Sequence, residues 1–165
     1  MTPSDLSDLT ARLIDAAKAA GANAADAMAV QGTSLSVDVR GGVLEQAERS
    51  EGIDIGLRVF IDGKQANVSS SDVSDRTITE MATRAVAMAR EAPVDPHAGL
   101  ADPDQLASSW DIATLELNDP SAEPSPAALQ ADALEAESAA MAVAGVAQVQ
   151  QATGAYGARD IWLAA

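Results

Sequence analysis

Hydrophobic residues recur at two different spacings along this chain, and each change of spacing marks a new element. Near the amino terminus the apolar positions lie three and four residues apart and form one stripe: Leu6, Leu9, Leu13, Ile14 and Ala17. This spacing predicts an amphipathic helix. Ser4 or Ser7 is suited to cap its first turn, and Gly21 is suited to end it.

Between residues 25 and 70 the spacing changes to two. Apolar and polar residues alternate in the segments 35–40 and 53–59, the segment 43–49 is heavily polar, and the segment 64–70 follows as a partner strand. Gly41-Gly42 and Asp62-Gly63 separate the flanking segments, and both pairs favour tight hairpin turns because they tolerate positive φ angles. The pattern predicts four or five antiparallel strands in meander order.

Two further helices are expected after the strands. The first has Ser74 or Asp72 as its cap, is followed by Pro93, and carries a buried stripe: Ile78, Met81, Ala82, Ala85, Val86 and Ala89. The second begins at Ser125-Pro126, a cap followed by proline at the first helical position, and runs to Gly145. Its apolar positions are Leu129, Ala133, Leu134, Ala136, Ala140, Met141 and Val143. Met81 and Met88 are interpreted as core packing.

The remaining segments give weaker patterns. Six of the seven prolines lie between residues 93 and 126, so segment 93–125 is expected to wrap over the surface without long helices. Its proposed anchors are Trp110, Ile112, Leu115 and Leu117. Segments 146–153 and 159–165 are predicted as a strand pair that turns at 154–157.

Together these elements predict an α+β fold, in which an antiparallel meander sheet packs with about three helices, over one domain at 1–165. Alanine makes up much of the apolar fraction and aromatic residues only 2%, so the expected core is thin. The apolar segment 161–165 would expose a sheet edge, and we therefore expect the chain to be part of a longer protein.

The charge and the missing residue types exclude several functions. The net charge of −15 disfavours binding to nucleic acids and to anionic membranes. The chain has no cysteine, which excludes disulfides, cysteine-ligated metals and thiol nucleophiles. It also has no apolar run of the roughly 20 residues that a membrane helix needs and no signal-peptide pattern. We expect a cytoplasmic protein.

Candidate chemistry is sparse. His97 is the only histidine, so the chain offers no His-Glu-x-x-His pair, and segment 69–71 has no general base to activate a serine. The segment 154–157 lacks the lysine of a phosphate-binding loop. Asp95, Asp102 and Asp104 are candidates for a calcium site, although the spacing of a calcium-binding loop is missing. We assign no catalytic, cofactor-binding or metal-ligating residue.

Several short segments, taken in order, resemble the amino-terminal domain of the TldD/PmbA family, which includes proteins called modulators of DNA gyrase. They are Glu48-Arg49-Ser50-Glu51-Gly52, Gly56-Leu57-Arg58-Val59-Phe60, Gly63-Lys64-Gln65-Ala66, Ser69-Ser70-Ser71-Asp72-Val73-Ser74 and Asp95-Pro96-His97-Ala98-Gly99-Leu100-Ala101-Asp102-Pro103. The match extends over nearly the whole chain and is clearest from Leu35 to Leu106. Arg49-Ser50-Glu51-Gly52 resembles the PmbA (TldE) type more than TldD.

The resemblance implies a non-catalytic amino-terminal domain of a PmbA-like subunit. Such a subunit would pair with a TldD-like catalytic subunit, or with itself, to form a cytoplasmic metalloprotease that matures or degrades unfolded peptides. The domain would help to enclose the substrate chamber, and the divalent metal, zinc, would be bound by the partner's carboxy-terminal motif, which this chain lacks. Two alternatives stay open: a free-standing peptide- or protein-interaction module, and a calcium-dependent or carboxylate-based enzyme.

Overall fold

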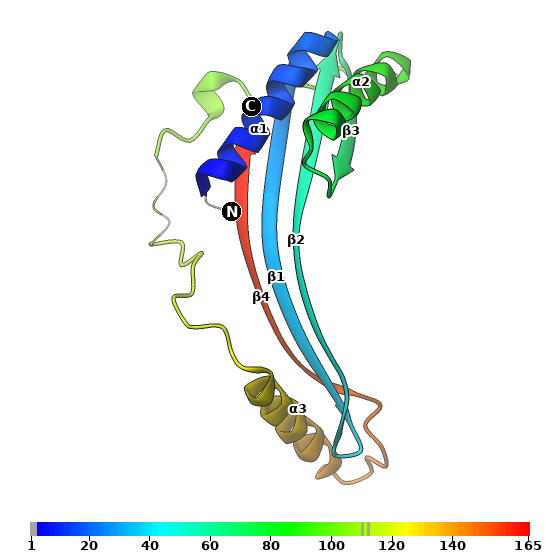
Figure 1. The fold of residues 1–165 in the computed structure, drawn as a ribbon, viewed down its shortest axis with the longest axis vertical. Helices are drawn as coiled ribbons and strands as arrows, with labels where there is room; N and C mark the ends of the chain where they lie inside the picture. Colours follow the sequence, from blue (N-terminus) through cyan, green and yellow to red (C-terminus); the bar gives the residue numbers. More distant parts are fainter. Residues whose placement is uncertain (1–2, 110, 112) are drawn as a thin grey trace. The chain divides into compact units, whose positions relative to one another are not determined.

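The computed structural model describes residues 3–109, 111 and 113–165 of the chain. Trp110 and Ile112, two of the expected anchors, lie outside the described residues, as does the side chain of Ser4. The elements, in chain order, are α1 (Pro3–Ala20), β1 (Ala24–Arg40), β2 (Val43–Ile61), β3 (Lys64–Ser70), α2 (Asp75–Glu91), the 3-10 helix η1 (Pro103–Gln105), α3 (Pro126–Met141) and β4 (Ala152–Ala164) (Figure 1).

The strands form one antiparallel sheet in the order β3-β2-β1-β4, which confirms the predicted α+β class. Both expected hairpin turns are present. Gly41 and Gly42 have φ angles of 61° and 76°, and Asp62 and Gly63 have φ angles of 50° and 73°. These left-handed conformations give the two-residue turns the twist that adjacent strands require.

The strands are longer than the alternation suggested. The segments 43–49 and 53–59, expected as separate strands, belong to the single strand β2. Gly52 lies between them without a positive φ angle, so the backbone continues in extended conformation rather than turning. A glycine inside a strand pattern is compatible with a break or with a continuous strand. The predicted boundary between the segments 43–49 and 53–59 was therefore wrong.

The contacts divide the chain into two compact units. Unit 1 contains the chain up to Gln31, Gly52–Ser109 and Arg159–Ala165. Unit 2 contains Gly32–Glu51 and the chain from residue 111 to Ala158. Strands β1, β2 and β4 contribute residues to both units.

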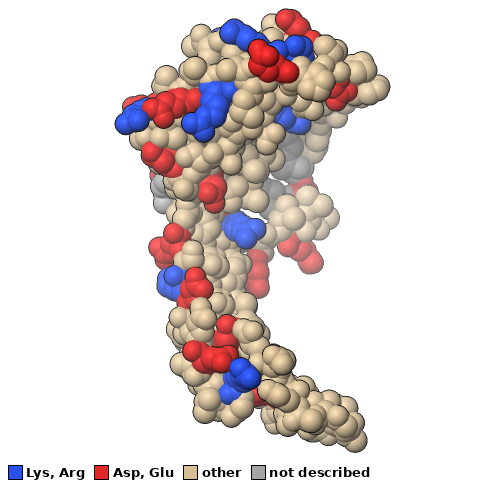
Figure 2. Space-filling view, turned by 90° about the vertical axis from the view of Figure 1, so that its right-hand side faces the viewer, with Lys and Arg blue, Asp and Glu red and all other residues tan. Residues whose placement is uncertain are grey.

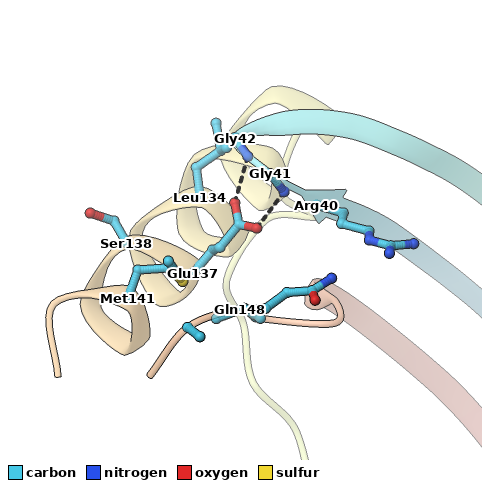
Figure 3. Close-up of a pocket in the computed structure, with 10 residues that line it drawn as sticks. Arg40, Gly41, Gly42, Leu134, Glu137, Ser138, Met141 and Gln148 are labelled. Carbon is cyan, nitrogen blue, oxygen red and sulfur yellow. Dashed lines mark hydrogen bonds between the residues drawn. The ribbon is translucent and has the colours of Figure 1, made fainter. Parts of the chain in front are cut away.

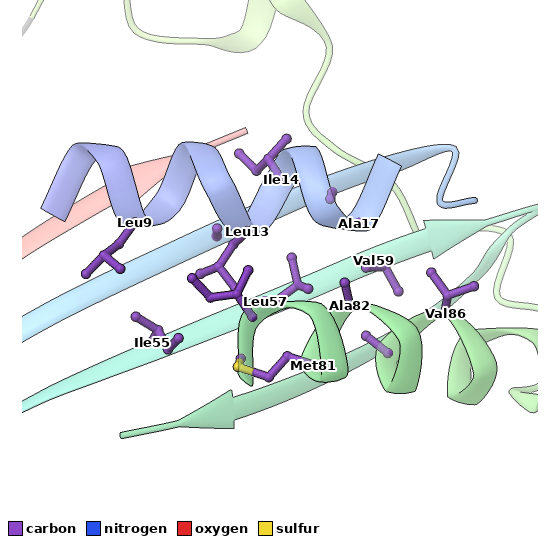
Figure 4. Packing of buried hydrophobic residues seen from close by; sticks show 14 of the residues in the cluster. Leu9, Leu13, Ile14, Ala17, Ile55, Leu57, Val59, Met81, Ala82 and Val86 are labelled. Atoms are coloured by element: carbon purple, nitrogen blue, oxygen red, sulfur yellow. The ribbon is translucent and has the colours of Figure 1, made fainter. Parts of the chain in front are cut away.

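The hydrophobic core of unit 1 lies between two helices and one face of the sheet (Figure 4). The predicted stripes of α1 and α2 are buried there, facing alternate residues of β1 and β2. The central members include Leu9, Leu13, Ile55, Leu57, Val59, Met81 and Val86. Met88 is 48% exposed, so the prediction that it packs in the core was wrong.

The amino terminus of α2 has the expected cap. The backbone N–H of Thr77 donates to Ser74 Oγ over 3.3 Å, and Asp72 accepts hydrogen bonds from the backbone N–H of Ser74 and from the hydroxyl of Thr77. The hydroxyl of Thr77 and, after it, the groups of Ser74 lower the pKa of the Asp72 carboxyl, because they stabilise its charged form.

We therefore expect Thr77→Val to raise the pKa of Asp72 toward its ordinary value. Folding lowers this pKa, so the charged Asp72 carboxyl stabilises the folded protein. This stabilisation is fully present above the pKa of Asp72 in the unfolded chain. It is lost as the pH falls through the pKa of Asp72 in the folded chain. A carboxyl titration followed by NMR in both proteins measures the shift. An Asp72 pKa that is unchanged in Thr77→Val would contradict the assignment of the hydroxyl as the main cause.

Unit 2 has a smaller core, in which Leu35, Val37 and Leu129 are buried and Tyr156 packs against them. Helix α3 begins as predicted, with the Ser125 side chain accepting from the N–H of Ala128, but it ends at Met141 rather than Gly145. Its buried line is Leu129, Ala133 and Glu137. Alanines lie on every side of this helix, so apolar spacing alone could not identify the buried face, and Met141 and Val143 are exposed.

The expected strand pair near the carboxyl end is wrong. Strand β4 runs without a turn through Gly154-Ala155-Tyr156-Gly157. A Cβ atom at Gly154 would lie 2.2 Å from the backbone oxygen of Leu129, so this glycine allows α3 to approach the strand backbone. Glycine inside a strand often marks such a close approach of another backbone.

Among its described residues, the proline-rich segment holds η1 and several turns. The side chains of Asp102 and Gln105 form a capping box at η1. Leu115 and Leu117 are 59% and 73% exposed, so they do not anchor the segment as predicted. In the described part of the chain, no helix combines the length and the hydropathy that are needed to cross a membrane.

Candidate functional site

The residues that the sequence marked for possible chemistry lie apart. His97 is exposed in a loop, where its backbone N–H donates to Asp95 Oδ1 over 2.9 Å. Asp102 is the residue that precedes η1. Ser70 is the last residue of β3, and the Ser70 hydroxyl accepts a hydrogen bond from the backbone N–H of Asp72. Nowhere in residues 3–109, 111 and 113–165 do three histidine, aspartate or glutamate side chains gather to hold a metal ion.

Unit 1 instead presents an open sheet face on the side away from α1 and α2. Side chains alternate between the two faces of a strand, so Asp26 and Met28 of β1 and Arg58 of β2 lie opposite the core residues. A shallow pocket of about 520 Å³ lies at this part of the sheet, and Met28, Gly56, Arg58, Asn67 and Leu163 are among the residues that line it. The face therefore combines apolar and polar groups that can contact another polypeptide.

One ion pair dominates the electrostatics of that open face. The guanidinium group of Arg58 hydrogen-bonds both carboxylate oxygens of Asp26 and lies 5.0 Å from the centre of the Phe60 ring. The hydrogen bond to Asp26 raises the pKa of Arg58. Because each charge already has its partner, this pair orders the face rather than supplying a free acid or base.

The end of β4 adds exposed apolar residues to unit 1. Ile161, Trp162 and Leu163 are 57%, 40% and 71% exposed, and β4 is an edge strand of the sheet. Adjacent exposed apolar side chains are typical of protein–protein contacts. The described chain thus offers an interaction surface here.

Unit 2 contains a second pocket, of about 550 Å³, beside the turn between β1 and β2 (Figure 3). Glu137 of α3 is only 6% exposed and points to this turn. Its Oε1 atom accepts the N–H of Gly41 over 2.6 Å, and its Oε2 atom accepts the N–H of Gly42 over 2.8 Å. Each carboxylate oxygen accepts one backbone N–H, so Glu137 holds the turn.

A hydrogen bond between strands lies elsewhere in unit 2. The hydroxyl of Thr153 in β4 donates to Asp38 Oδ1 in β1 over 2.7 Å. This contact, followed by one from Gln151, lowers the pKa of Asp38. The carboxylate is therefore held in its charged form as part of the sheet.

The sequence reasoning did not find Glu137 or the Asp26–Arg58 pair. For Glu137 a signal existed, since it follows Leu129 and Ala133 at intervals of four residues in a helix built mostly of alanine. For Asp26 and Arg58 no local signal exists, because 32 residues separate them and only the strand register brings them together.

Parts of this chain match known proteins. Residues 25–89 match the model of PmbA/TldA metallopeptidase domain 1. The chain is 35% identical over 109 residues to the metalloprotease PmbA of Escherichia coli O157:H7, covering 66% of this chain and 24% of that protein. It is 33% identical over 104 residues to the metalloprotease PmbA homolog of Haemophilus influenzae, covering 63% and 22%.

Solved structures share the fold at low sequence identity. A protein of Bacteroides thetaiotaomicron assigned as a modulator of DNA gyrase covers 99% of this chain with a TM-score of 0.66 and 16% identity. TldE of Thermococcus kodakarensis covers 94% with a TM-score of 0.65 and 15% identity. The chain spans 36% and 34% of these two structures, and about a quarter of the curated relatives that it matches. The chain therefore belongs to the PmbA/TldD family and carries the amino-terminal domain of that family.

Proposed function

We propose that this chain is the non-catalytic amino-terminal domain of a PmbA/TldE-like subunit in a heterodimeric cytoplasmic metalloprotease. It would help to enclose the chamber in which a TldD-like partner matures or degrades unfolded peptides. The observation that carries this proposal is the match of residues 25–89 with domain 1 of a metallopeptidase family. The likeness to TldE supports the choice of subunit type.

The metal implied by the family name does not fit the described residues of this chain. Among the described residues no three histidine, aspartate or glutamate side chains gather at one point, His97 is exposed in its loop, and Glu137 accepts two backbone N–H groups. A catalytic zinc site uses about three protein ligands that converge on one ion. We therefore propose that this domain does not bind the catalytic metal and that the partner supplies the metal ligands, with zinc as the expected metal.

The open face of unit 1 gives the proposal a structural basis. Met28 and Leu163 are 42% and 71% exposed there, and the pocket they line has an ordered ion pair between Asp26 and Arg58. A wall domain needs such a surface, because it must contact other parts of the assembly or the substrate without performing chemistry.

The test is made with the whole protein and a TldD-like subunit expressed together. We expect the two subunits to co-purify and to cleave an unfolded peptide, and either subunit alone to be inactive. Replacing Leu163 with aspartate should weaken assembly or cleavage at least tenfold, since it places a charge in the open face. Leu117→Asp is the control, because Leu117 is 73% exposed and lies in the proline-rich segment.

Two results would count against the proposal. One is peptide cleavage by the whole protein without a partner subunit. The other is a complex in which Leu163→Asp and Leu117→Asp both behave like the unmodified protein.

A further inference from the structure

Among the described residues of unit 2, no strand pairs with one edge of β2. Strand β3 pairs with β2 only from Ile55↔Ser70 to Ile61↔Lys64. The sheet order places β1 on the other side of β2, so among the described residues the segment Val43–Glu51 has no strand on the β3 side. We call this segment the free edge.

The free edge is accessible along its length. Every residue from Val43 to Glu51 is exposed, including the apolar Val43 and Leu44 at 65% and 48%. Alternate residues of a strand direct their backbone N–H and C=O groups to each side, so the free edge presents donors and acceptors that an added strand would satisfy. Extended peptides bind to sheets in this way, through backbone hydrogen bonds.

The net charge of unit 2 indicates which kind of polypeptide can bind to the free edge. This unit contains 11 acidic residues against 2 basic ones, a net charge of −9 out of −15 for the chain. Both basic residues already pair with carboxylates, Arg40 with Glu45 and Arg49 with Glu51 and Glu123. The side chain of Glu48 forms no ion pair with either of these arginines. Figure 2 views the molecule from the side on which β2 lies in Figure 1 and shows acidic side chains along it, with basic side chains among them.

These charges distinguish the possible partners. A second copy of the chain would bring another strongly acidic unit to the same edge, and like charges facing each other across strands are unfavourable. A segment rich in lysine and arginine would be attracted by the net negative charge of unit 2 and by the carboxylate of Glu48. We propose that the free edge Val43–Glu51 binds a basic polypeptide segment in extended conformation, which adds to the sheet as a strand beside β2.

The binding test uses the whole protein and a labelled peptide of about eight residues in which lysine and threonine alternate, the length of an ordinary strand. We expect saturable binding by fluorescence anisotropy at about 50 mM salt, weakened at least threefold at about 200 mM salt. In amide NMR spectra the largest shifts should fall within residues 43–51. Binding by this protein alone is measured, so the outcome does not depend on the proposed partner subunit.

Two control peptides separate strand pairing from simple charge attraction. Replacing each threonine with proline keeps the lysines but removes alternate N–H donors, and we expect binding to fall at least fivefold. Replacing each lysine with glutamate should abolish binding. Equal binding of the proline peptide would overturn the strand-addition claim, and equal binding of the acidic peptide would overturn the claim of charge selection.

Protein variants localise the site. Glu48→Lys should weaken binding of the basic peptide about fivefold, because it reverses an unpaired charge on the free edge. Glu91→Lys makes the same charge change at an exposed position in α2 and should leave binding within twofold. Equal effects of the two variants, shifts outside residues 43–51, or a dimer of the protein formed through this edge would each overturn the proposal.

Discussion

Replacing Gly154 with alanine is expected to lower the free energy of unfolding by about 3 kcal/mol. The added Cβ atom would lie 2.2 Å from the oxygen, 2.9 Å from the carbonyl carbon and 3.1 Å from the Cα atom of Leu129. All three are backbone atoms, so the clash cannot be relieved by a side-chain rotation. Overpacking of this kind typically costs 1–3 kcal/mol, and backbone displacement places it at the upper end.

Gly157 provides a matched control in the same strand. A Cβ atom there would meet only the Thr33 oxygen, at 3.9 Å, which is an ordinary contact. Gly157→Ala should therefore change stability by less than about 1 kcal/mol. Urea unfolding followed by circular dichroism compares the two variants. If Gly154→Ala is no less stable than Gly157→Ala, the close approach of α3 to β4 is wrong.

Replacing Glu137 with alanine should have a comparable effect, a loss of about 3 kcal/mol. The change removes an acceptor that is 6% exposed and bonded to two N–H groups, at Gly41 and Gly42. Hydrogen bonds to charged groups contribute roughly 1.5–3 kcal/mol each, and removing the carboxylate lets water reach part of the site, so the two losses do not simply add. Glu137→Gln keeps one oxygen and should lose about half as much.

Glu135 in the same helix is the control, because it is exposed and Glu135→Ala should change stability by less than about 0.5 kcal/mol. A local measurement adds to the global one. Amide hydrogen exchange at Gly41 and Gly42 should accelerate in Glu137→Ala and stay unchanged in Glu135→Ala. Unchanged exchange at the turn in Glu137→Ala would show that the carboxylate does not hold it.

The parts of the fold that could be predicted are those with a local cause. Ser74 and Ser125 cap helices because their side chains reach N–H groups a few residues away, and Gly41-Gly42 turns because both residues take positive φ angles. The buried stripes of α1 and α2 follow from helical spacing. Each of these signals lies within a few residues of its effect.

The parts that failed depend on contacts between distant segments. The local sequence around Gly154 predicted a turn. The role of Gly154 is instead to let Leu129 of α3 approach the strand, and the local sequence does not reveal this contact. The Asp26–Arg58 pair requires the register of two strands, and the buried face of α3 is hidden by alanines on every side. No local pattern could have resolved the role of Gly154 or the Asp26–Arg58 pair, whereas the spacing of Leu129, Ala133 and Glu137 was a signal for the buried face of α3.

The proposed function requires that residues 1–165 serve a metalloprotease without supplying its metal ligands. The most direct test is the metal content of the complex between the whole protein and a TldD-like subunit, after His97→Ala is combined with Asp95→Asn, Asp102→Asn and Asp104→Asn. We expect the same metal-to-complex ratio and the same rate of peptide cleavage as in the unmodified complex. Loss of the metal together with loss of cleavage would contradict it.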